Sequence, residues 1–150
     1  MVLCFINQKM SEQDKQIYDP VHGFITITPL MKSIIDTPEF QRLRDLKQLG
    51  AVHYVYPSAV HTRFEHSLGV SHLAGIMAES LIKRTSLQNS KRTVELIRIA
   101  ALVHDIGHGP YSHLYDNRIR HPSEPEHEER GCAIFSDMVR KYNLLLNEEE

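Results

Sequence analysis

The sequence predicts a mainly α-helical domain with a minor β element near its N-terminus. Apolar residues recur at helical spacing over much of the chain after residue 37, and a short segment at 24–28 favours a strand. The chain has 150 residues, of which 41% are hydrophobic and 24% charged, as in a soluble globular domain. We therefore expect one helical bundle that buries a core of its own.

The first element expected is the short strand. Residues 1–18 carry little apolar periodicity, so they are interpreted as a flexible N-terminal segment. The run 19–23 has the composition of a turn, and residues 24–28 favour a strand that Pro29 ends. The folded domain is then predicted to cover residues 19–150.

Four helices are expected after the strand. Thr37, Pro38 and Glu39 supply an N-cap, a proline at the first helical position and an acidic first turn. Gly50 can close this helix in the left-handed conformation. The other helices are expected at 64–81, 93–105 and 125–146, with a loop at 117–126.

The apolar spacing also predicts how these helices pack. The second helix should bury one face, formed by Phe64, Leu68, Leu73, Ile76, Met77 and Leu81. The third should face inward with Val94, Ile97, Ala101 and Leu102. Gly69 and Gly75 are expected to mark the close approach of another helix. The first two helices should pack on the helix that ends at Asp105.

Bulk composition narrows the classes of partner. Lys and Arg number 17 against 19 Asp and Glu, so the formal net charge of -2 gives no global basic field, and any polyanion site must be local. Cys4 and Cys132 form no CxxC pair, which favours a reducing compartment. The apolar run 1–6 is far shorter than the roughly 20 residues of a membrane span, so no membrane partner is expected.

An adjacent imidazole and carboxylate at the end of an apolar helix form the main chemical signal. His104 and Asp105 stand where Gly107 stops the helix, and burying an unpaired carboxylate is costly unless a metal ion removes that cost. Arg63 and His66 offer a guanidinium and another imidazole one helix-and-loop unit upstream. A zinc-protease pair of His104 with the histidine four residues later is rejected, because that motif needs Glu at position 105 and an unbroken helix.

Four segments of the chain resemble the HD-domain phosphohydrolases. They are residues 36–44, 47–50, 63–69 and 104–113. His66 resembles the first metal-binding histidine of that family, and His104-Asp105 resembles the doublet from which the family takes its name. Within the family, the match is closest to the deoxynucleoside triphosphate triphosphohydrolases that in animals join a SAM domain to an HD domain. It runs from about Asp19 to the last residue.

The resemblance implies an HD-type helical bundle that hydrolyses deoxynucleoside triphosphates to a deoxynucleoside and triphosphate. It implies metal ligands at His66, His104 and Asp105, acid–base residues at His113, Asp116 and His127, and substrate contacts at Gln48, Leu49, Arg63 and His108. Imidazole and carboxylate ligands suit a divalent transition metal such as Fe, Zn or Mn, and further oxygen ligands would admit Mg. The family's fourth ligand, a downstream aspartate, has no counterpart, so we expect a partial HD domain with weak or no activity in isolation.

Regulation is implied by the same resemblance. Lys15, Asp36, Gln41 and Arg44 occupy the positions of a GTP or dGTP activator site in a homotetramer. Tyr18 and Phe24 depart from the family there, so effector preference is expected to differ. The resemblance also implies single-stranded nucleic acid as a candidate partner. It implies a location in the nucleus, the cytoplasm or both. Without the resemblance, the charges at 36 and 44 would be interpreted as exposed helix charges.

Two other functions are weighed against this hydrolase. One is a catalytically incomplete nucleotide-binding or assembly module, which the absent fourth ligand favours. The other is a generic helical interaction domain, which leaves the cluster of arginine, histidine and aspartate residues unexplained. The hydrolase is the function we predict.

Overall fold

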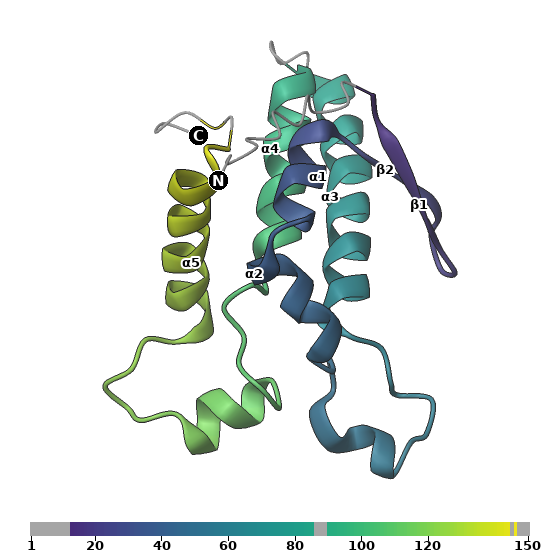
Figure 1. Cartoon of the computed structure of the whole chain (residues 1–150). Helices are drawn as coiled ribbons and strands as arrows, with labels where there is room; N and C mark the ends of the chain where they lie inside the picture. The colour runs from purple at the N-terminus through teal and green to yellow at the C-terminus, as the bar shows by residue number, and fades with distance from the viewer. Residues whose placement is uncertain (1–12, 86–89, 145, 147–150) are drawn as a thin grey trace, which may run out of the picture.

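The computed structural model describes residues 13–85, 90–144 and 146, and helices make up most of this part of the chain (Figure 1). The α-helices are α1 (Pro29–Ile35), α2 (Pro38–Gln41), α3 (Arg63–Thr85), α4 (Ser90–Val103) and α5 (His127–Tyr142). Shorter helical turns are η1 (Arg42–Asp45), η2 (Gly50–Tyr54) and the π-helical η3 (Tyr115–Ile119). Strands β1 (Lys15–Asp19) and β2 (Gly23–Ile27) form a two-stranded antiparallel sheet. The predicted fold class is confirmed.

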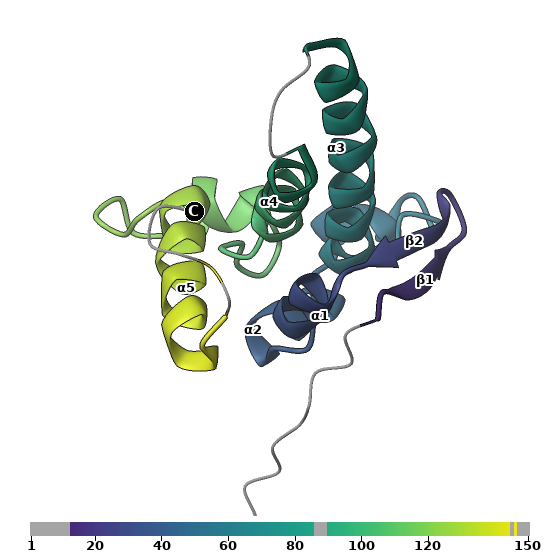
Figure 2. The same cartoon turned by 90° about the horizontal axis from the view of Figure 1, so that it is seen from above.

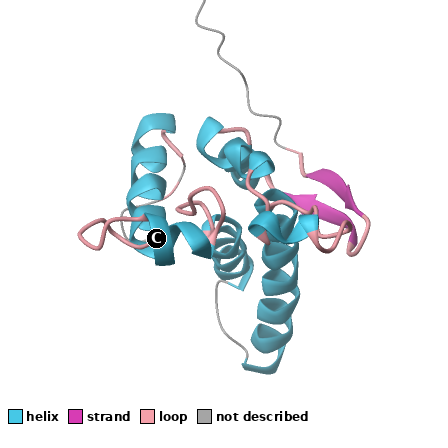
Figure 3. Cartoon of the chain, turned by 90° about the horizontal axis from the view of Figure 1, so that it is seen from below, coloured by secondary structure: helices cyan, strands magenta, loops and turns pink. Residues whose placement is uncertain are grey.

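Helices α3 and α4 lie side by side at the centre of the molecule (Figure 1). The β-hairpin covers the outer side of α3, and α5 stands beyond α4, as the view from above also shows (Figure 2). From below, the two strands lie at one edge of an otherwise helical structure (Figure 3). The start of α3, the end of α4 and the start of α5 therefore lie at the same end of the molecule.

The core lies where α1, α2 and η1 meet α3, α4 and α5. Its most buried side chains are Ile25, Ile27, Met31, Ile34, Phe40, Leu43, Phe64, Leu68, Ile99, Leu102, Ile106 and Met138. The rings of Phe40 and Phe64 meet edge to face at 5.5 Å, a favourable arrangement of two aromatic side chains. None of the helices described has the length and apolar character needed to cross a lipid bilayer.

The hairpin extends further toward the N-terminus than expected. Residues 15–18 were assigned from the sequence to the flexible segment, but they belong to β1 and pair with β2. Pairing with β2 across the sheet stabilises these residues, and the spacing of apolar residues within the segment gives no sign of that pairing. The turn at 19–23 is as predicted, with the Oδ1 atom of Asp19 accepting two backbone hydrogen bonds of 2.8 Å. Residues 1–12 lie outside the described residues.

The helix expected from residue 37 to Gly50 is broken. Thr37 caps α2 as predicted, but the α-helix stops at Gln41, and the backbone is extended again at Leu46. The cause is tertiary: the carbonyl of Leu46 accepts a hydrogen bond of 2.8 Å from the backbone N–H of Arg63. Gly50 does take the left-handed conformation (φ 56°) but opens η2.

Three other boundaries differ from the sequence prediction. Pro29 ends β2 and also starts α1, a helix the apolar spacing did not reveal. The loop expected at 117–126 begins with the π-helical turn η3. Helix α5 ends before Asn143, which takes a left-handed conformation (φ 48°), so it is shorter than the predicted 125–146.

The apolar face predicted for α3 is wrong beyond its first turns. Leu73, Ile76, Met77 and Leu81 are 49–65% exposed, and on α4 Ile97 is also exposed. The buried face of α3 instead continues from Phe64 and Leu68 through the small residues Ser67, Ser71, Gly75 and Ala78. A Cβ atom on Gly75 would lie 2.8 Å from the Arg98 side chain of α4, so small residues permit the close crossing. Gly69 faces the side chain of His22 rather than a helix.

The crossing of α5 over the turn after α4 gives a test of this packing. A Cβ atom on Gly107 would lie 1.9 Å from the carbonyl oxygen of His127 and 2.4 Å from the backbone N of Gly131. Gly107→Ala should therefore lower the free energy of unfolding by about 1–3 kcal/mol, as overpacking does elsewhere. Urea denaturation would measure this change.

Gly131→Ala is the matched control on the other side of the same crossing. Its new Cβ would meet no atom closer than 3.5 Å, and alanine favours a helix over glycine by up to about 1 kcal/mol. Equal unfolding midpoints for the two variants would contradict the close crossing.

Candidate metal centre and acid–base group

Side chains with metal-binding and acid–base chemistry gather at the end of the molecule where α3 begins and α4 ends. At the start of α3, Glu65 accepts hydrogen bonds from the backbone N–H of Thr62 (2.9 Å) and from its hydroxyl, so its carboxylate satisfies a donor just before the first turn. This start places Arg63 and His66 on the first turn. Helix α4 ends at Val103, and a tight turn carries the next residues toward α3.

His66, His104 and Asp105 form the first group, and their geometry fits one divalent ion. The Nε2 atom of His66 lies 3.4 Å from Oδ2 of Asp105, and that of His104 lies 3.3 Å from Oδ1. Donors held about 2.1 Å from one ion, at right or tetrahedral angles, are roughly 3.0–3.4 Å apart. The two imidazole planes are inclined by 61°, so lone pairs in these planes can converge on one ion.

The protonation states of this group also suit a metal ion. The Nδ1 atom of His104 lies 2.7 Å from the carbonyl oxygen of Ala101, which leaves Nε2 free to be a ligand. Burial lowers the pKa of His66, and nearby His104 and Arg63 add to this effect against the charge of Asp105. The imidazole of His66 is therefore neutral at neutral pH, as metal ligation requires.

Asp105 is held as a carboxylate. Burial by itself raises the pKa of its carboxyl, but the hydrogen bond with His108 and the charges of His104 and Arg63 outweigh burial, so the pKa lies below its ordinary value. The Nη1 atom of Arg63 lies 2.5 Å from Oδ2 of Asp105. The first group thus presents two imidazoles beside one anionic carboxylate.

Arg63, predicted from the sequence to contact substrate phosphate, is only 1% exposed. Apart from its contact with Asp105, its Nε and Nη2 atoms have no hydrogen-bond partner among the described residues. Buried donors without a partner are costly. Both nitrogens are shielded from solvent in this structure, and the phosphate contact stays a prediction.

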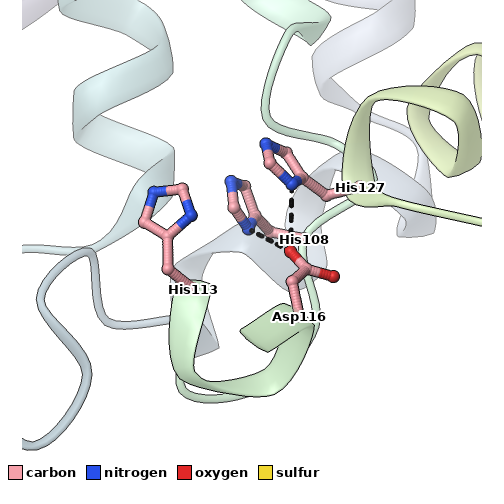
Figure 4. A group of neighbouring side chains, drawn as sticks. All are labelled: His108, His113, Asp116 and His127. Carbon is pink, nitrogen blue, oxygen red and sulfur yellow. Dashed lines mark ion pairs between the residues drawn. The ribbon is translucent and has the colours of Figure 1, made fainter. Parts of the chain in front are cut away.

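His108, His113, Asp116 and His127 form the second group (Figure 4). His127 begins α5, and Asp116 lies in η3. The carboxylate of Asp116 faces two histidines, with Oδ2 2.9 Å from Nδ1 of His127 and 3.8 Å from Nδ1 of His108. The ring of His113 stands edge-on to the other two rings, at 5.0 and 5.5 Å between centroids. The structure thus brings all three predicted acid–base residues together.

Ring geometry separates this second group from a metal centre. The imidazoles of His108 and His127 are stacked at 3.9 Å with 20° between their planes. Lone pairs in nearly parallel planes this far apart cannot both point at one ion about 2.1 Å away. The group is better suited to moving protons.

The charges around the second group agree with that role. Burial by itself raises the pKa of Asp116, but the hydrogen bond and charge of Arg130 outweigh it, so the net pKa is lowered. Burial lowers the pKa of His108, whose side chain lies between the two groups. Its Nε2 atom is 3.4 Å from Oδ1 of Asp105. His108 therefore links the metal-binding group to the acid–base group.

The predicted substrate residues Gln48 and Leu49 lie beside His113. All three line a cavity of about 480 Å³. The hydroxyl of Ser112, whose backbone is left-handed (φ 55°), donates to the carbonyls of Lys47 (3.0 Å) and Gln48 (3.1 Å). Oε1 of Gln48 is buried with no hydrogen-bond partner among the described residues. The arrangement fits the prediction that this pair contacts substrate.

Three of the four predicted activator residues lie close to one another. Gln41 donates to a backbone carbonyl at the end of α1 (2.7 Å) and accepts from Nε of Arg44 (2.8 Å). Asp36 caps the same end of α1, and the guanidinium of Arg44 lies 3.5 Å from the centre of the Phe64 ring. No hydrogen bond or ion pair of the described residues joins Lys15 to these three. The nucleotide site stays a prediction.

Two arginines at this end of the molecule were missed by the sequence interpretation. Arg42 donates to the carbonyls of Ile106 and His108, and Arg130 binds Asp116. An arginine in a helical segment is typical of a solvated face, and its partners here lie far along the chain. The sequence carries no local signal for either contact.

Comparison with known proteins agrees with this geometry. The model of the HD domain family matches residues 63–148. Deoxynucleoside triphosphate triphosphohydrolase SAMHD1 of Mus musculus is 45% identical over 153 residues, which cover 97% of this chain and 23% of the relative. The protein of the same name from Homo sapiens is 49% identical over 135 residues, 87% of this chain and 22% of the relative. The putative HD domain-containing protein L394 of Acanthamoeba polyphaga mimivirus is 39% identical over 160 residues, 94% of this chain and 35% of the relative.

The chain thus spans about a quarter of the length of the mouse and human relatives. The match with the mouse protein takes in nearly the whole of this chain, and with it both groups of side chains described above.

Removal of a ligand should test the metal centre. After incubation with Mn²⁺ or Zn²⁺ and desalting, His104→Ala should retain far less metal than the unmodified chain. Changes to residues that only support a ligand already cost roughly 10–100-fold in affinity. Elemental analysis of the protein gives the readout. His121→Ala, in an exposed loop, is the control, and equal metal content in both variants would reject the assigned ligand.

The buried histidines predict how stability depends on pH. Burial lowers the pKa of His66 and His108 in the folded chain, so the unfolded chain takes up protons first as the pH falls. The metal-free protein should therefore lose stability below about pH 6.5, the ordinary pKa of histidine. His66→Gln should make this loss shallower between about pH 7 and 5, measured by urea denaturation in EDTA. His121→Gln is the control, and an unchanged slope in His66→Gln would contradict the prediction.

Proposed function

The chain belongs to the HD domain family, and from this we propose that it carries the metal-binding and acid–base residues of a deoxynucleoside triphosphate triphosphohydrolase. One observation carries the proposal: His66, His104 and Asp105 converge with ligand geometry, and His108 connects them to a second group with acid–base geometry. The substrate class is supported by the relatives that match most of this chain, which are named for that reaction.

The first group would hold a divalent ion such as Fe, Zn or Mn, and Mg is a further candidate. Such an ion polarises a phosphoryl oxygen and makes a bound water a better nucleophile. Arg63 would contact phosphate oxygens in the bidentate manner of a guanidinium. Gln48 and Leu49 would contact the deoxyribose from the cavity they share with His113.

His113 is the proton donor in this proposal. Its side chain is exposed at the cavity, whereas His108 is buried. Exposure lets His113 reach a substrate oxygen, and its ring stands edge-on to those of His108 and His127. Protonation of the departing deoxyribose oxygen would release triphosphate intact. Asp116 and His127 would fix the group's charge and orientation.

A regulatory site is a second part of the proposal. The exposed carboxylate of Asp36 can accept two hydrogen bonds from a guanine edge, which supports GTP or dGTP as an activator bound with Lys15, Gln41 and Arg44. Tyr18 and Phe24, predicted to alter effector preference, are exposed cross-strand neighbours with rings 5.3 Å apart. Homotetramer formation, binding of single-stranded nucleic acid and a nuclear or cytoplasmic location stay predictions.

Product analysis tests the proposed reaction. With metal and dGTP, a form that carries the complete active site should give deoxyguanosine and triphosphate, separated by ion-exchange chromatography. His113→Ala should lower kcat by roughly 10²–10⁴-fold, the contribution of a general acid, with little change in dGTP binding. His121→Ala is the control. Pyrophosphate with dGMP as products would reject the reaction, and dGTP binding without turnover would favour a nucleotide-binding module.

A further inference from the structure

Arg130 joins three separate segments at the acid–base group. It lies one helical turn after His127, and each of the three nitrogens of its guanidinium donates a hydrogen bond to a different segment. Nη2 donates to Oδ1 of Asp116 at 2.7 Å, Nε to the carbonyl of Gly107 at 3.1 Å, and Nη1 to the carbonyl of Pro125 at 2.6 Å. A solvated helix charge has no such fixed set of partners.

We propose that Arg130 is a positioning residue for the acid–base group, acting through Asp116. The inference rests on the proposed function, because it assigns Arg130 a part in the same reaction. Arg130 holds one oxygen of the Asp116 carboxylate, which restrains its rotation, and the other oxygen lies 2.9 Å from Nδ1 of His127, a charge contact without hydrogen-bond geometry. A guanidinium can do this because its donors have a fixed planar geometry.

The position of Arg130 on α5 supports this role. Residues three apart on a helix are neighbours on its surface, so Arg130 and His127 face Asp116 together. The bond to Gly107 extends the same constraint to the turn that carries Asp105 and His108. Arg130 therefore fixes the distance between the α5 end of the acid–base group and the turn beside the metal centre.

Arg120 is a second arginine near Asp116, and it does not explain the orientation of the Asp116 carboxylate. The Nε atom of Arg120 is 3.9 Å from Oδ1 of Asp116, beyond hydrogen-bond length, and its Nη2 lies 3.7 Å from Glu126. Arg120 contributes only its positive charge, whereas Arg130 also orients the Asp116 carboxylate through a hydrogen bond. The two arginines can therefore be separated by substitution.

Three variants test the proposal. Arg130→Met removes the charge and the fork of donors, and Arg130→Lys keeps the charge without the fork. Arg140→Met is the matched control, since Arg140 lies on the same helix, is exposed and, among the described residues, pairs only with Asp137 three positions earlier. All three keep His66, His104 and Asp105, so bound metal should be unchanged, which elemental analysis checks.

The first measurement does not depend on turnover. In ¹⁵N NMR spectra, the unmodified protein should show His127 with its proton on Nδ1, facing Asp116. Both Arg130 variants should show a mixture of tautomers, and Arg140→Met should match the unmodified protein. A failure of the proposed reaction would leave this test intact. An unchanged His127 tautomer in folded Arg130→Lys would overturn the proposal.

The second measurement is the division of the effect between kcat and KM. Both Arg130 variants should lower kcat for triphosphate release by roughly 10–100-fold, the usual effect of losing a group that orients a functional residue, with KM changed less than about twofold. A merely structural role would lower the unfolding temperature without changing kcat of the folded protein. If Arg130→Met does not fold, Arg130→Lys decides the test, and full kcat in it would overturn the proposal.

Discussion

The buried ion pair between Arg63 and Asp105 is the interaction on which the site depends. Arg63 is the first residue of α3, and Asp105 lies just beyond the last residue of α4. The pair therefore joins the start of α3 to the end of α4. Two such charges are costly to bury, and removal of one partner from a buried pair typically costs about 3–5 kcal/mol. The same carboxylate faces His66 and His104, so the fold and the metal centre share one residue.

The two groups of histidines differ in orientation more than in composition. Each group contains imidazoles, one aspartate and a nearby arginine. In the first, the ring planes are inclined, and in the second, His108 and His127 are stacked. Because the lone pairs of an imidazole lie in its plane, inclination favours ligation of an ion, and stacking excludes two of the rings from the same ion. Residue types alone do not distinguish these cases.

Close backbone approach makes this arrangement possible. Gly75 and its small neighbours bring α4 against α3, and Gly107 lets the start of α5 cross the turn after α4. Two arginines donate hydrogen bonds to the backbone carbonyls of that turn. Arg42 donates to those of Ile106 and His108, and Arg130 donates to that of Gly107. Three backbone carbonyls of the turn that follows α4 thus accept hydrogen bonds from arginine side chains. The turn that carries the ligands is held from two sides.

The sequence by itself determined the helical class and the α2 cap at Thr37, because both depend on local spacing and on capping side chains within a few residues of chain. The adjacency of His104 and Asp105 indicated a metal site, whereas His113, Asp116 and His127 were implied only by the resemblance to the HD-domain phosphohydrolases. Only the tertiary structure decided which face of α3 is buried, where the helix after Thr37 stops, and how the histidine rings are inclined. The face of α3 depends on the helix it meets, and the break at Leu46 depends on a backbone bond from Arg63. The contacts of Arg42 and Arg130 join residues as far as 66 positions apart, and no local pattern encodes a contact at such separation.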